Sequence, residues 1–320
     1  MSEGGVSVKG LERLGGFSPN FMDPNGGCLF LVATPIGNLE DISLRAIRIL
    51  READLIAAED TRHSRKLLTH FEISTPMTSY HEHNKHSKGL QLIEQVKLGK
   101  KIALITDAGM PGISDPGHEL VVLAWQAELP VVVIPGPSAG ILALVASGFK
   151  TNRFVFEGFL STEKKVRSNQ LKSLSAEQGT TVLYEAPHRL KKTLEELAGY
   201  LEDRKIVVAR ELTKKFEEIV KGTAPELVEY FQQKGIKGEF VLVIEGGEAT
   251  LPGQSGEWWA ELSLEAHVEF LIKEGQPKKE VIKEVAKVRN LPKREVYQAV
   301  LPEKQPAIHS TTFDKIKTPT

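Results

Sequence analysis

The sequence contains very little cysteine: of 320 residues, only Cys28 carries a thiol. A single cysteine excludes an intramolecular disulfide framework and a zinc site built from several cysteines. It also fits a reducing compartment, where disulfides are rare. We therefore expect a cytoplasmic protein.

Long apolar runs are missing as well. No segment approaches the roughly 20 apolar residues that a membrane-spanning helix needs. Residues 1–27 lack the apolar core of a secretory signal peptide, so we interpret them as a flexible extension. We expect no partnership with a membrane.

The sequence also lacks an excess of positive charge. Its 41 Lys and Arg residues nearly balance 42 Asp and Glu residues, and the net charge is −1. Any polyanion must therefore bind to a local basic patch. Neither G-x-x-x-x-G-K-[ST] nor a G-x-G-x-x-G after a strand occurs, which argues against a nucleoside triphosphate or NAD as ligand.

Alternating strand and helix patterns begin at Cys28. Helical segments separate the predicted buried strands, which lie at 28–34, 54–59, 77–81, 101–107 and 131–136. Strands that alternate with helices indicate crossover units and a largely parallel sheet. We therefore predict an N-terminal α/β domain over residues 28–137.

A second α/β series follows and predicts a C-terminal α/β domain over residues 138–247. Its strands are expected within 153–160, 180–186, 205–214 and 238–246. The rest of the chain is predicted to form a Gly- and Pro-rich linker at 248–263, a helical module at 264–302 and a flexible tail at 303–320. Within the module, residues 276–300 predict two helices with a short break at Asn290–Pro292.

The segment LITDAGMPGISDPGHEL, residues 104–120, joins a predicted strand to a predicted helix. Ligands of open α/β sheets bind at the carboxyl ends of strands. The glycines allow close backbone approach to a ligand, and Asp107 and Asp115 offer hydrogen-bond acceptors. A plain connection with nothing bound is the alternative, but about four residues would be enough for it. We therefore predict a ligand loop.

Two more predicted strands end in elaborate turns. VATPIGNLED (32–41) leaves the first strand and AAEDTRHSRK (57–66) leaves the second. In a parallel sheet, both turns open on the same edge as the ligand loop, so we expect all three to meet there. The charges of 57–66 would also fit a solvated helix start, with Asp60 or Thr61 as its N-cap.

The segment SYHEHNKHSK (79–88) contains three histidines, His81, His83 and His86. Their spacing matches neither H-E-x-x-H nor a Cys/His cluster, so we predict no metal site. A polar loop that touches an anionic substrate is the favoured interpretation.

Charged segments also end two strands of the second domain, YEAPHR (184–189) and ARELTKKFEE (209–218). Tyr184 and Arg189 are placed to line a cleft between the domains. Glu217 and Glu218 fit helix caps or surface ion pairs.

Nine short segments follow one another along the chain in this order: TPIGNLED, LIAAEDTRHSRKLL, YHEHN, DAGMPGISDPG, VIPGPSA, FEGFL, YEAPHRL, ARELTK and KGEFVLVIEG. Together they resemble the small-subunit (16S) ribosomal RNA (cytidine-2′-O)-methyltransferase I family, which belongs to the tetrapyrrole-methylase superfamily. The resemblance runs from about Cys28 to Gly246, and the helical module is similar to the C-terminal extension of the family. Each segment alone is weakly specific, whereas the ordered set is highly specific.

The resemblance implies a two-domain tetrapyrrole-methylase-like α/β fold with S-adenosylmethionine (SAM) in the cleft between the domains. It also implies a homodimer that methylates the ribose of a cytidine in the decoding region of 16S rRNA, in the small ribosomal subunit. Carried over by motif, the SAM site comprises Pro35, Asp107, Ala108, Gly109, Ile113, Pro135, Ser138, Tyr184 and the strand near Glu239. Pro35, Gly37 and Asn38 would lie near the methyl group.

The same resemblance implies that four residues face the RNA: Glu59, Asp60, Arg62 and His63. A ribose hydroxyl is a poor nucleophile while it is protonated, so a base within hydrogen-bond reach would help. Asp60 or Glu59 is the first candidate for this base and His63 the third, and Asn38 is a further catalytic candidate.

Local basic groups would have to hold the RNA. They comprise Arg62, Arg65 and Lys66 beside the predicted site, Lys164, Lys165, Arg167 and Arg189 in the second domain, and Lys278, Lys279, Lys283, Lys287, Arg289, Lys293 and Arg294 in the module. Two short helices with a tight break can form a helix-turn-helix-like RNA clamp. Glutamates lie between these cations, so a solvated helix pair is an equal alternative.

One residue departs from the family pattern: Met110 stands where the A-G-T-P segment of the family has Thr. If that hydroxyl bonds SAM in relatives, another group substitutes for it here or SAM binds more weakly, and we expect activity to remain. Two other functions stay open. One is methylation of a tetrapyrrole or a modified amino acid by a related enzyme, and the other is non-catalytic binding to RNA or the ribosome.

Overall fold

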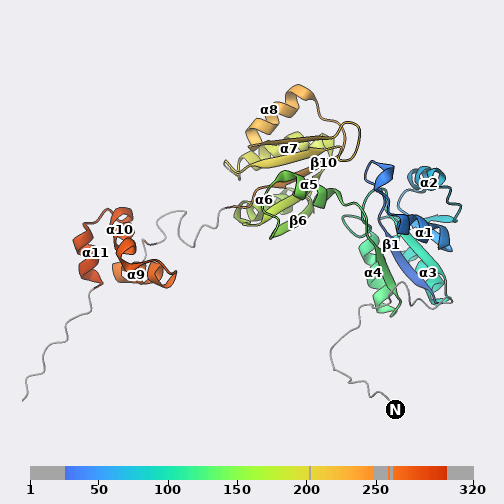
Figure 1. The fold of residues 1–320 in the computed structure, drawn as a ribbon, viewed down its shortest axis with the longest axis horizontal. Helices are drawn as coiled ribbons and strands as arrows, with labels where there is room; N and C mark the ends of the chain where they lie inside the picture. Colours follow the sequence, from blue (N-terminus) through green and yellow to red (C-terminus); the bar gives the residue numbers. More distant parts are fainter. Residues whose placement is uncertain (1–25, 202, 248–258, 260–261, 301–320) are drawn as a thin grey trace, which may run out of the picture. The chain divides into compact units, whose positions relative to one another are not determined.

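The computed structural model describes residues 26–201, 203–247, 259 and 262–300. The elements drawn in Figure 1 begin with β1 (Cys28–Val32), η1 (Leu39–Asp41), α1 (Leu44–Glu52), β2 (Leu55–Ala58), α2 (Thr61–His70), β3 (Met77–Ser79), α3 (Lys85–Lys97), β4 (Lys101–Ile105), α4 (Gly117–Gln126) and β5 (Val131–Ile134). They continue with α5 (Ala139–Ser147), β6 (Phe154–Phe159), α6 (Lys164–Ala176), β7 (Thr180–Glu185), α7 (Pro187–Ala198), β8 (Ile206–Arg210), β9 (Glu218–Gly222), α8 (Ala224–Lys234) and β10 (Phe240–Ile244). The last three helices are α9 (Leu264–Lys273), α10 (Lys278–Val288) and α11 (Lys293–Ala299).

The chain divides into two compact units, residues 1–248 and 249–320. The larger unit contains both sheets, and the smaller one contains α9, α10 and α11. Among the residues that the structure describes, no helix is long and apolar enough to cross a bilayer. The extension 1–27 (apart from residues 26 and 27), most of the linker 248–263 and the tail 303–320 lie outside those residues. The predicted domain boundary at 137/138 stays a prediction.

The first sheet has the strand order β3-β2-β4-β1-β5, and all of its strands are parallel. Side chains alternate between its two faces. Phe30 and Val32 of β1 pack with α1 and α2, whereas Leu29 and Leu31 pack with α3 and α4. Helices α3 and α4 also pack against each other (Figure 1). Because helices cover both faces, β1, β2 and β5 are apolar throughout and β4 is apolar after Lys101, which is why a continuous apolar run predicts them well.

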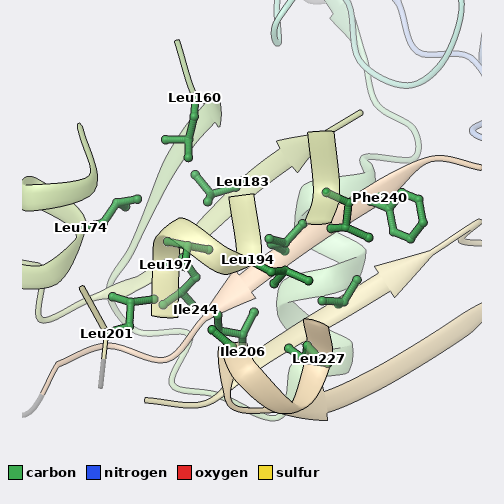
Figure 2. Packing of buried hydrophobic residues seen from close by; sticks show 14 of the residues in the cluster. Leu160, Leu174, Leu183, Leu194, Leu197, Leu201, Ile206, Leu227, Phe240 and Ile244 are labelled. Atoms are coloured by element: carbon green, nitrogen blue, oxygen red, sulfur yellow. The ribbon is translucent and has the colours of Figure 1, made fainter. Parts of the chain in front are cut away.

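The second sheet has the order β6-β7-β10-β8-β9 and is mixed. Strand β6 pairs with β7 in parallel, while β10 is antiparallel to both β7 and β8. One face packs on α6, α7 and α8 (Figure 2), where Leu174, Leu194, Leu227 and Phe240 form part of the core. The other face packs on α5. The α/β class predicted for both halves is confirmed.

Every predicted strand is present, and most are one to four residues shorter than the sequence pattern. Strand β9 was not predicted. It pairs antiparallel with β8 at the edge of the sheet, and its first four residues alternate between partly buried and exposed. A short edge strand with charged residues gives little apolar signal, which explains the omission.

The two helices predicted within residues 276–300 are confirmed as α10 and α11, with the break between them. With α9 they bury a small core that includes Val268, Val281 and Val296. Arg289 binds this unit together: it donates hydrogen bonds to the carbonyl oxygen of Leu262, at 2.8 Å, and to Nδ1 of His267, at 3.1 Å. Arg289 therefore has a structural role, although it was counted among the basic groups available to RNA.

Arg167 of α6 differs from expectation in the same way. Its side chain is only 7% exposed, and its guanidinium donates to Glu196 Oε2 at 2.6 Å and to Thr193 Oγ1 at 2.7 Å. The Thr193 hydroxyl in turn donates to the buried carboxylate of Glu185. This network joins α6, α7 and the end of β7. We call the part of the larger unit built on the first sheet the first lobe and the part built on the second sheet the second lobe. The Arg167 guanidinium therefore lies inside the second lobe and is not available at its surface.

We predict that Arg167→Ala lowers the free energy of unfolding by about 3–5 kcal/mol, because it leaves the partly buried Glu196 carboxylate and the buried Thr193 hydroxyl without the guanidinium that binds them. Thermal or urea unfolding, followed by circular dichroism, measures this. Lys164→Ala provides the matched control on the same helix: Lys164 is exposed, and we expect a change within about 0.5 kcal/mol. Equal effects of the two substitutions would contradict the structural role of Arg167.

Candidate active site at the carboxyl edge of the first sheet

Three loops meet at the carboxyl edge of the first sheet. They follow β1, β2 and β4, which are neighbours in the order β2-β4-β1. Thr34 and Gly109 exchange two backbone hydrogen bonds, at 2.9 and 3.0 Å, so the loop after β1 is joined to the loop after β4. The Thr34 hydroxyl also donates to the Thr106 carbonyl oxygen at 3.1 Å. The predicted convergence of the strand-end loops is confirmed.

Glycine is needed at position 109 because the backbone there has φ +82°. A residue with a Cβ is strained in this left-handed region. A Cβ would also lie 3.4 Å from Ile36 Cγ2 and 3.6 Å from the carbonyl oxygen of Pro137. The loop therefore presents bare backbone beside the turn that follows β1.

The loops after β2 and β4 are joined through their acidic residues. Asp107 Oδ1 accepts the backbone N–H of Asp60 at 3.1 Å, and the Thr106 hydroxyl donates to Glu59 Oε2 at 2.7 Å. Burial raises the pKa of Asp107, an effect that the Asp60 N–H opposes and the nearby Glu59 carboxylate reinforces. Two acidic groups are thus held close together at the rim of the sheet.

Asp115 shapes the second half of the ligand loop. Its carboxylate accepts the backbone N–H of Gly112 at 2.8 and 3.0 Å and that of Gly117 at 2.7 Å. Burial raises the pKa of Asp115, and these N–H groups act in the opposite direction. The side chain closes the loop on itself at the start of α4, so its role is to hold the backbone in shape.

A cavity of about 230 Å³ opens between these loops and α2. The residues that line it come from all three strand ends and from the exposed start of α2: Thr34, Pro35, Gly37, Leu39, His63, Ser64, Lys66, Leu67, Thr106 and Asp107. We call it the α2 cavity. Ser64 and Thr106 were not among the predicted site residues. Thr106 could have been found from its place at the end of a predicted strand, whereas Ser64 could not.

The four predicted catalytic residues have different surroundings. His63 lines the α2 cavity. Glu59 is half-buried and bonded to Thr106. Asp60 is the N-cap of α2, and Asn38 caps η1 by accepting the N–H of Glu40. The N-cap alternative raised for Asp60 is thus what the structure shows.

Asp60 is further engaged by its neighbour Arg62. Its Oδ2 lies 3.0 Å from the Arg62 guanidinium, and its Oδ1 accepts the Arg62 backbone N–H at 2.8 Å. These hydrogen bonds lower the pKa of Asp60 to about 2. A carboxylate that holds a proton so weakly is a poor general base near neutral pH.

The second lobe contributes an aromatic corner. Tyr184 packs edge-on against Phe156 and Phe159 and accepts the backbone N–H of Gly140 at 3.2 Å. Burial raises the pKa of Tyr184, while the Gly140 N–H and a hydrogen bond with Ser138 act in the opposite direction. Tyr184 and Ser138, both predicted site residues, are thereby brought together.

Strand β6, which carries Phe156 and Phe159, approaches the ligand loop at Gly158. A Cβ placed on Gly158 of β6 would lie 3.2 Å from Ser114 Oγ, one residue after Ile113. The predicted residues Ala108, Ile113 and Pro135 are exposed. Exposed apolar groups therefore remain available at this junction.

Lys214 is a contact of the site that the sequence did not single out. A Cβ on Gly37 would lie 2.3 Å from Lys214 Cγ, so the lysine stem already fills the space beside this glycine. The Lys214 ammonium is held by Glu211 at 2.9 Å and Glu239 at 3.0 Å. The strand near Glu239 thus meets the turn after β1 through Lys214.

The predicted RNA-binding cations fall into three groups. Arg62, Arg65 and Lys66 of α2 are exposed. Arg189 differs: its Nε lies 3.3 Å from Glu185 Oε1, and it donates to the carbonyl oxygen of Leu160. Lys293 and Arg294, also exposed, belong to the smaller unit and are considered with it alone.

The histidine-rich loop has a different character. The rings of His81 and His83 meet edge-on at 5.9 Å, and Nδ1 of His81 is buried without a hydrogen-bond partner in the described structure. Within those residues, no three His, Cys, Asp or Glu side chains are grouped as a metal site would require.

Glu218, for which the sequence suggests a helix cap or a surface ion pair, forms an ion pair in the second sheet. Its carboxylate lies 3.5 Å from the Arg210 guanidinium.

Known proteins share this sequence and fold. Residues 28–228 match the family of tetrapyrrole (corrin/porphyrin) methylases. A curated protein of Halalkalibacterium halodurans, "Ribosomal RNA small subunit methyltransferase I", is 51% identical over 85% of this chain and 93% of its own length. Proteins of the same name from Bacillus subtilis and Synechocystis are 50% and 47% identical, over 85% and 86% of this chain and 94% and 98% of their own lengths. The chain belongs to the ribosomal RNA small subunit methyltransferase I family.

Solved structures agree on the fold of the family. Diphthine synthase matches with a TM-score of 0.55 at 17% identity, covering 68% of this chain and 90% of that one. Cobalt precorrin-4 methyltransferase and the uroporphyrin-III-C-methyltransferase of Thermus thermophilus match with TM-scores of 0.54 and 0.52. Both are 19% identical and cover 68% of this chain and 94% of theirs. The predicted tetrapyrrole-methylase-like fold is confirmed.

SAM is the methyl donor of this methyltransferase family, and the chemistry of the site fits it. The half-buried carboxylate of Asp107 suits a cationic or hydroxyl-bearing ligand. Ile113 and Phe159, 44% and 47% exposed, offer apolar surface for a flat ring. Gly109 and Gly112, both with positive φ, allow close approach of the backbone. These residues would hold SAM between the ligand loop and the aromatic corner.

We predict that Asp115→Ala raises the KM for SAM about tenfold or more, because two backbone N–H groups of the ligand loop lose their acceptor. Steady-state methyl transfer at varied SAM concentration measures this. Asp115→Asn provides the matched control, since its amide oxygen can still accept from Gly112 or Gly117, and a smaller effect is expected. An unchanged KM in Asp115→Ala would separate this loop from SAM binding.

Proposed function

We propose that the protein transfers the methyl group of SAM to the ribose 2′-oxygen of a cytidine in the decoding region of 16S rRNA, within the small ribosomal subunit. The names of its relatives support an rRNA substrate. The observation that carries the proposal is the α2 cavity, which adjoins the predicted SAM loop at Asp107 and lies under a helix with three exposed cations. An anionic acceptor approaching the methyl donor would meet those cations first.

The reaction is an in-line displacement. The 2′-oxygen attacks the methyl carbon, the carbon–sulfur bond breaks, and S-adenosylhomocysteine leaves as a neutral thioether. Alignment of oxygen, carbon and sulfur can lower the activation free energy by about 7–11 kcal/mol. Here the turn 34–38 is held by the Thr34–Gly109 hydrogen bonds and by Lys214, so the protein can fix both substrates against one rigid turn.

His63 is the residue that we propose as the general base. It alone, of the three acid–base candidates, lines the α2 cavity. Imidazole is the side chain that most often accepts a proton in catalysis. Glu59 is bonded to Thr106, and the Asp60 carboxylate caps α2. The proton of the 2′-hydroxyl would therefore pass to a ring nitrogen of His63 as the methyl group transfers.

We predict that His63→Gln lowers kcat about 100-fold or more, because a positioned base contributes roughly 10²–10⁴ in rate. Single-turnover methyl transfer at saturating SAM and subunits measures the chemical step. Asp60→Asn is the comparison: its amide oxygen can still cap α2, but the charge that pairs with Arg62 is lost. We expect a smaller fall in kcat and a melting temperature close to that of the wild type. A larger fall in Asp60→Asn than in His63→Gln would return the role to Asp60.

RNA binding in this proposal is local. Arg62, Arg65 and Lys66 form an exposed basic stretch at the start of α2, and Lys164 and Lys165 are exposed on α6. In the smaller unit, Lys293 and Arg294 lie on α11, which follows α10 after a short break, as in a helix-turn-helix. Such contacts to phosphates make the binding sensitive to salt, although the net charge of the chain is only −1.

The assembly and location of the protein complete the proposal. We propose a homodimer in the cytoplasm. Exposed apolar side chains support an interface, since Ile141 and Val145 of α5 are 45% and 69% exposed and are spaced four residues apart on one helix face. Sedimentation equilibrium at twice the chain mass of 35.3 kDa is the expected result, and a monomer at micromolar concentration would oppose it.

The test of the function is methyl transfer from labelled SAM to small ribosomal subunits that lack the modification. Free 16S rRNA and a tetrapyrrole precursor serve as parallel acceptors. We expect label in the RNA of the subunits at a single position that resists alkaline cleavage, as a 2′-O-methylated nucleotide does. Label in the tetrapyrrole alone, or SAM binding without transfer, would support one of the two other functions.

A further inference from the structure

The size of the α2 cavity limits what it can hold. Its volume is about 230 Å³. Pockets that enclose drug-sized ligands have about 300–1,000 Å³. A whole SAM molecule therefore exceeds the cavity, whereas a single flat ring with its substituents suits it. The cavity is better matched to part of the acceptor than to the methyl donor.

The walls of the cavity are of two kinds. Pro35, Leu39 and Leu67 form apolar surface, as a flat ring requires. Among the polar lining residues, Thr34 and Thr106 already donate their hydroxyl hydrogens within the protein, to a carbonyl and to a carboxylate. These two hydroxyls are therefore committed to holding the loops together.

Ser64 is the exception among the lining hydroxyl groups. It is 2% exposed, and its Oγ is buried without a hydrogen-bond partner in the part of the chain that the structure describes. A buried hydroxyl without a partner destabilises the folded state, so its presence calls for an explanation. A ligand in the cavity that Ser64 lines supplies one, because a ring nitrogen, carbonyl or amino group would be the missing partner.

The surroundings of Ser64 set the direction of approach. On α2, Ser64 lies between His63 and the pair Lys66 and Leu67, all of which line the same cavity. His63 and Lys66 are exposed, whereas Ser64 is buried. A bound group would therefore meet Lys66 and the His63 ring at the mouth and the Ser64 hydroxyl deeper inside, and rotation about χ1 can turn the hydroxyl toward it.

We propose that the α2 cavity holds the pyrimidine ring of the acceptor nucleotide, turned out of the RNA stack, and that the Ser64 hydroxyl hydrogen-bonds to a polar atom of that ring. This inference rests on the proposed function and specifies where the base lies. Enzymes whose target is a base within structured nucleic acid extrude that nucleotide into a pocket, and here the same movement would bring the ribose of the nucleotide to the methyl donor. Phosphates on either side of the nucleotide would remain outside, within reach of Lys66.

The experiment uses the full chain with the substitution Ser64→Ala. Methyl transfer to unmodified small subunits gives the KM for subunits and the KM for SAM, and a thermal melt gives the stability. Thr69→Ala is the matched control, because Thr69 is an exposed hydroxyl residue of the same helix and does not line the cavity.

We expect Ser64→Ala to raise the KM for subunits about two- to tenfold, as loss of one hydrogen bond does, with the KM for SAM unchanged. We also expect a melting temperature equal to or above that of the wild type, because the substitution removes a hydroxyl with no partner in the free protein. Affinity for the acceptor and stability would then change independently. Thr69→Ala should leave both KM values unchanged.

Four results would overturn the inference. A rise in the KM for SAM alone would assign the cavity to the cofactor. A lower melting temperature with unchanged KM values would make Ser64 a structural residue. No transfer to subunits by the wild-type protein would overturn the proposed function and this inference with it, whereas transfer by the wild type with unaltered kinetics in Ser64→Ala overturns the inference alone.

Discussion

Two backbone hydrogen bonds between Thr34 and Gly109 hold the active edge of the first sheet together. They form an isolated antiparallel bridge just beyond the ends of β1 and β4, which themselves pair in parallel, so the two loops are held to each other. The α2 cavity, the acidic pair at Glu59 and Asp107 and the ligand loop are all built on these joined loops. Because Gly109 has φ +82°, the pairing depends on a residue without a side chain.

The sequence predicted the strands and the meeting of their loops because these follow from local patterns. β1 and β10 are buried along their whole length, and an apolar run bounded by Gly, Pro or Asp identifies such strands. Parallel order then places consecutive strand ends on one edge. Strand β9 was not predicted because it lies at a sheet edge, exposes Ile219 and Lys221 and only partly buries Glu218 and Val220, so it has no apolar run.

The roles of individual charged and polar residues were harder to predict, because they depend on neighbours far along the chain. Arg167 becomes a buried cation only when α7 brings Glu196 and Thr193 to it. Asp60 is equally plausible in sequence as cap or base, and only the position of the Arg62 guanidinium distinguishes the two. No pattern marks Ser64, since lack of a partner is a property of the folded chain.

Gly37 belongs to the first lobe, yet the atoms that would block a side chain there belong to Lys214 of the second. The turn that lines the α2 cavity is therefore also a contact between the two lobes. A side chain at position 37 would displace the Lys214 stem, and with it the ammonium that Glu211 and Glu239 hold. A hydrogen atom in place of a methyl group at residue 37 thus lets the two lobes lie directly against each other beside the cavity.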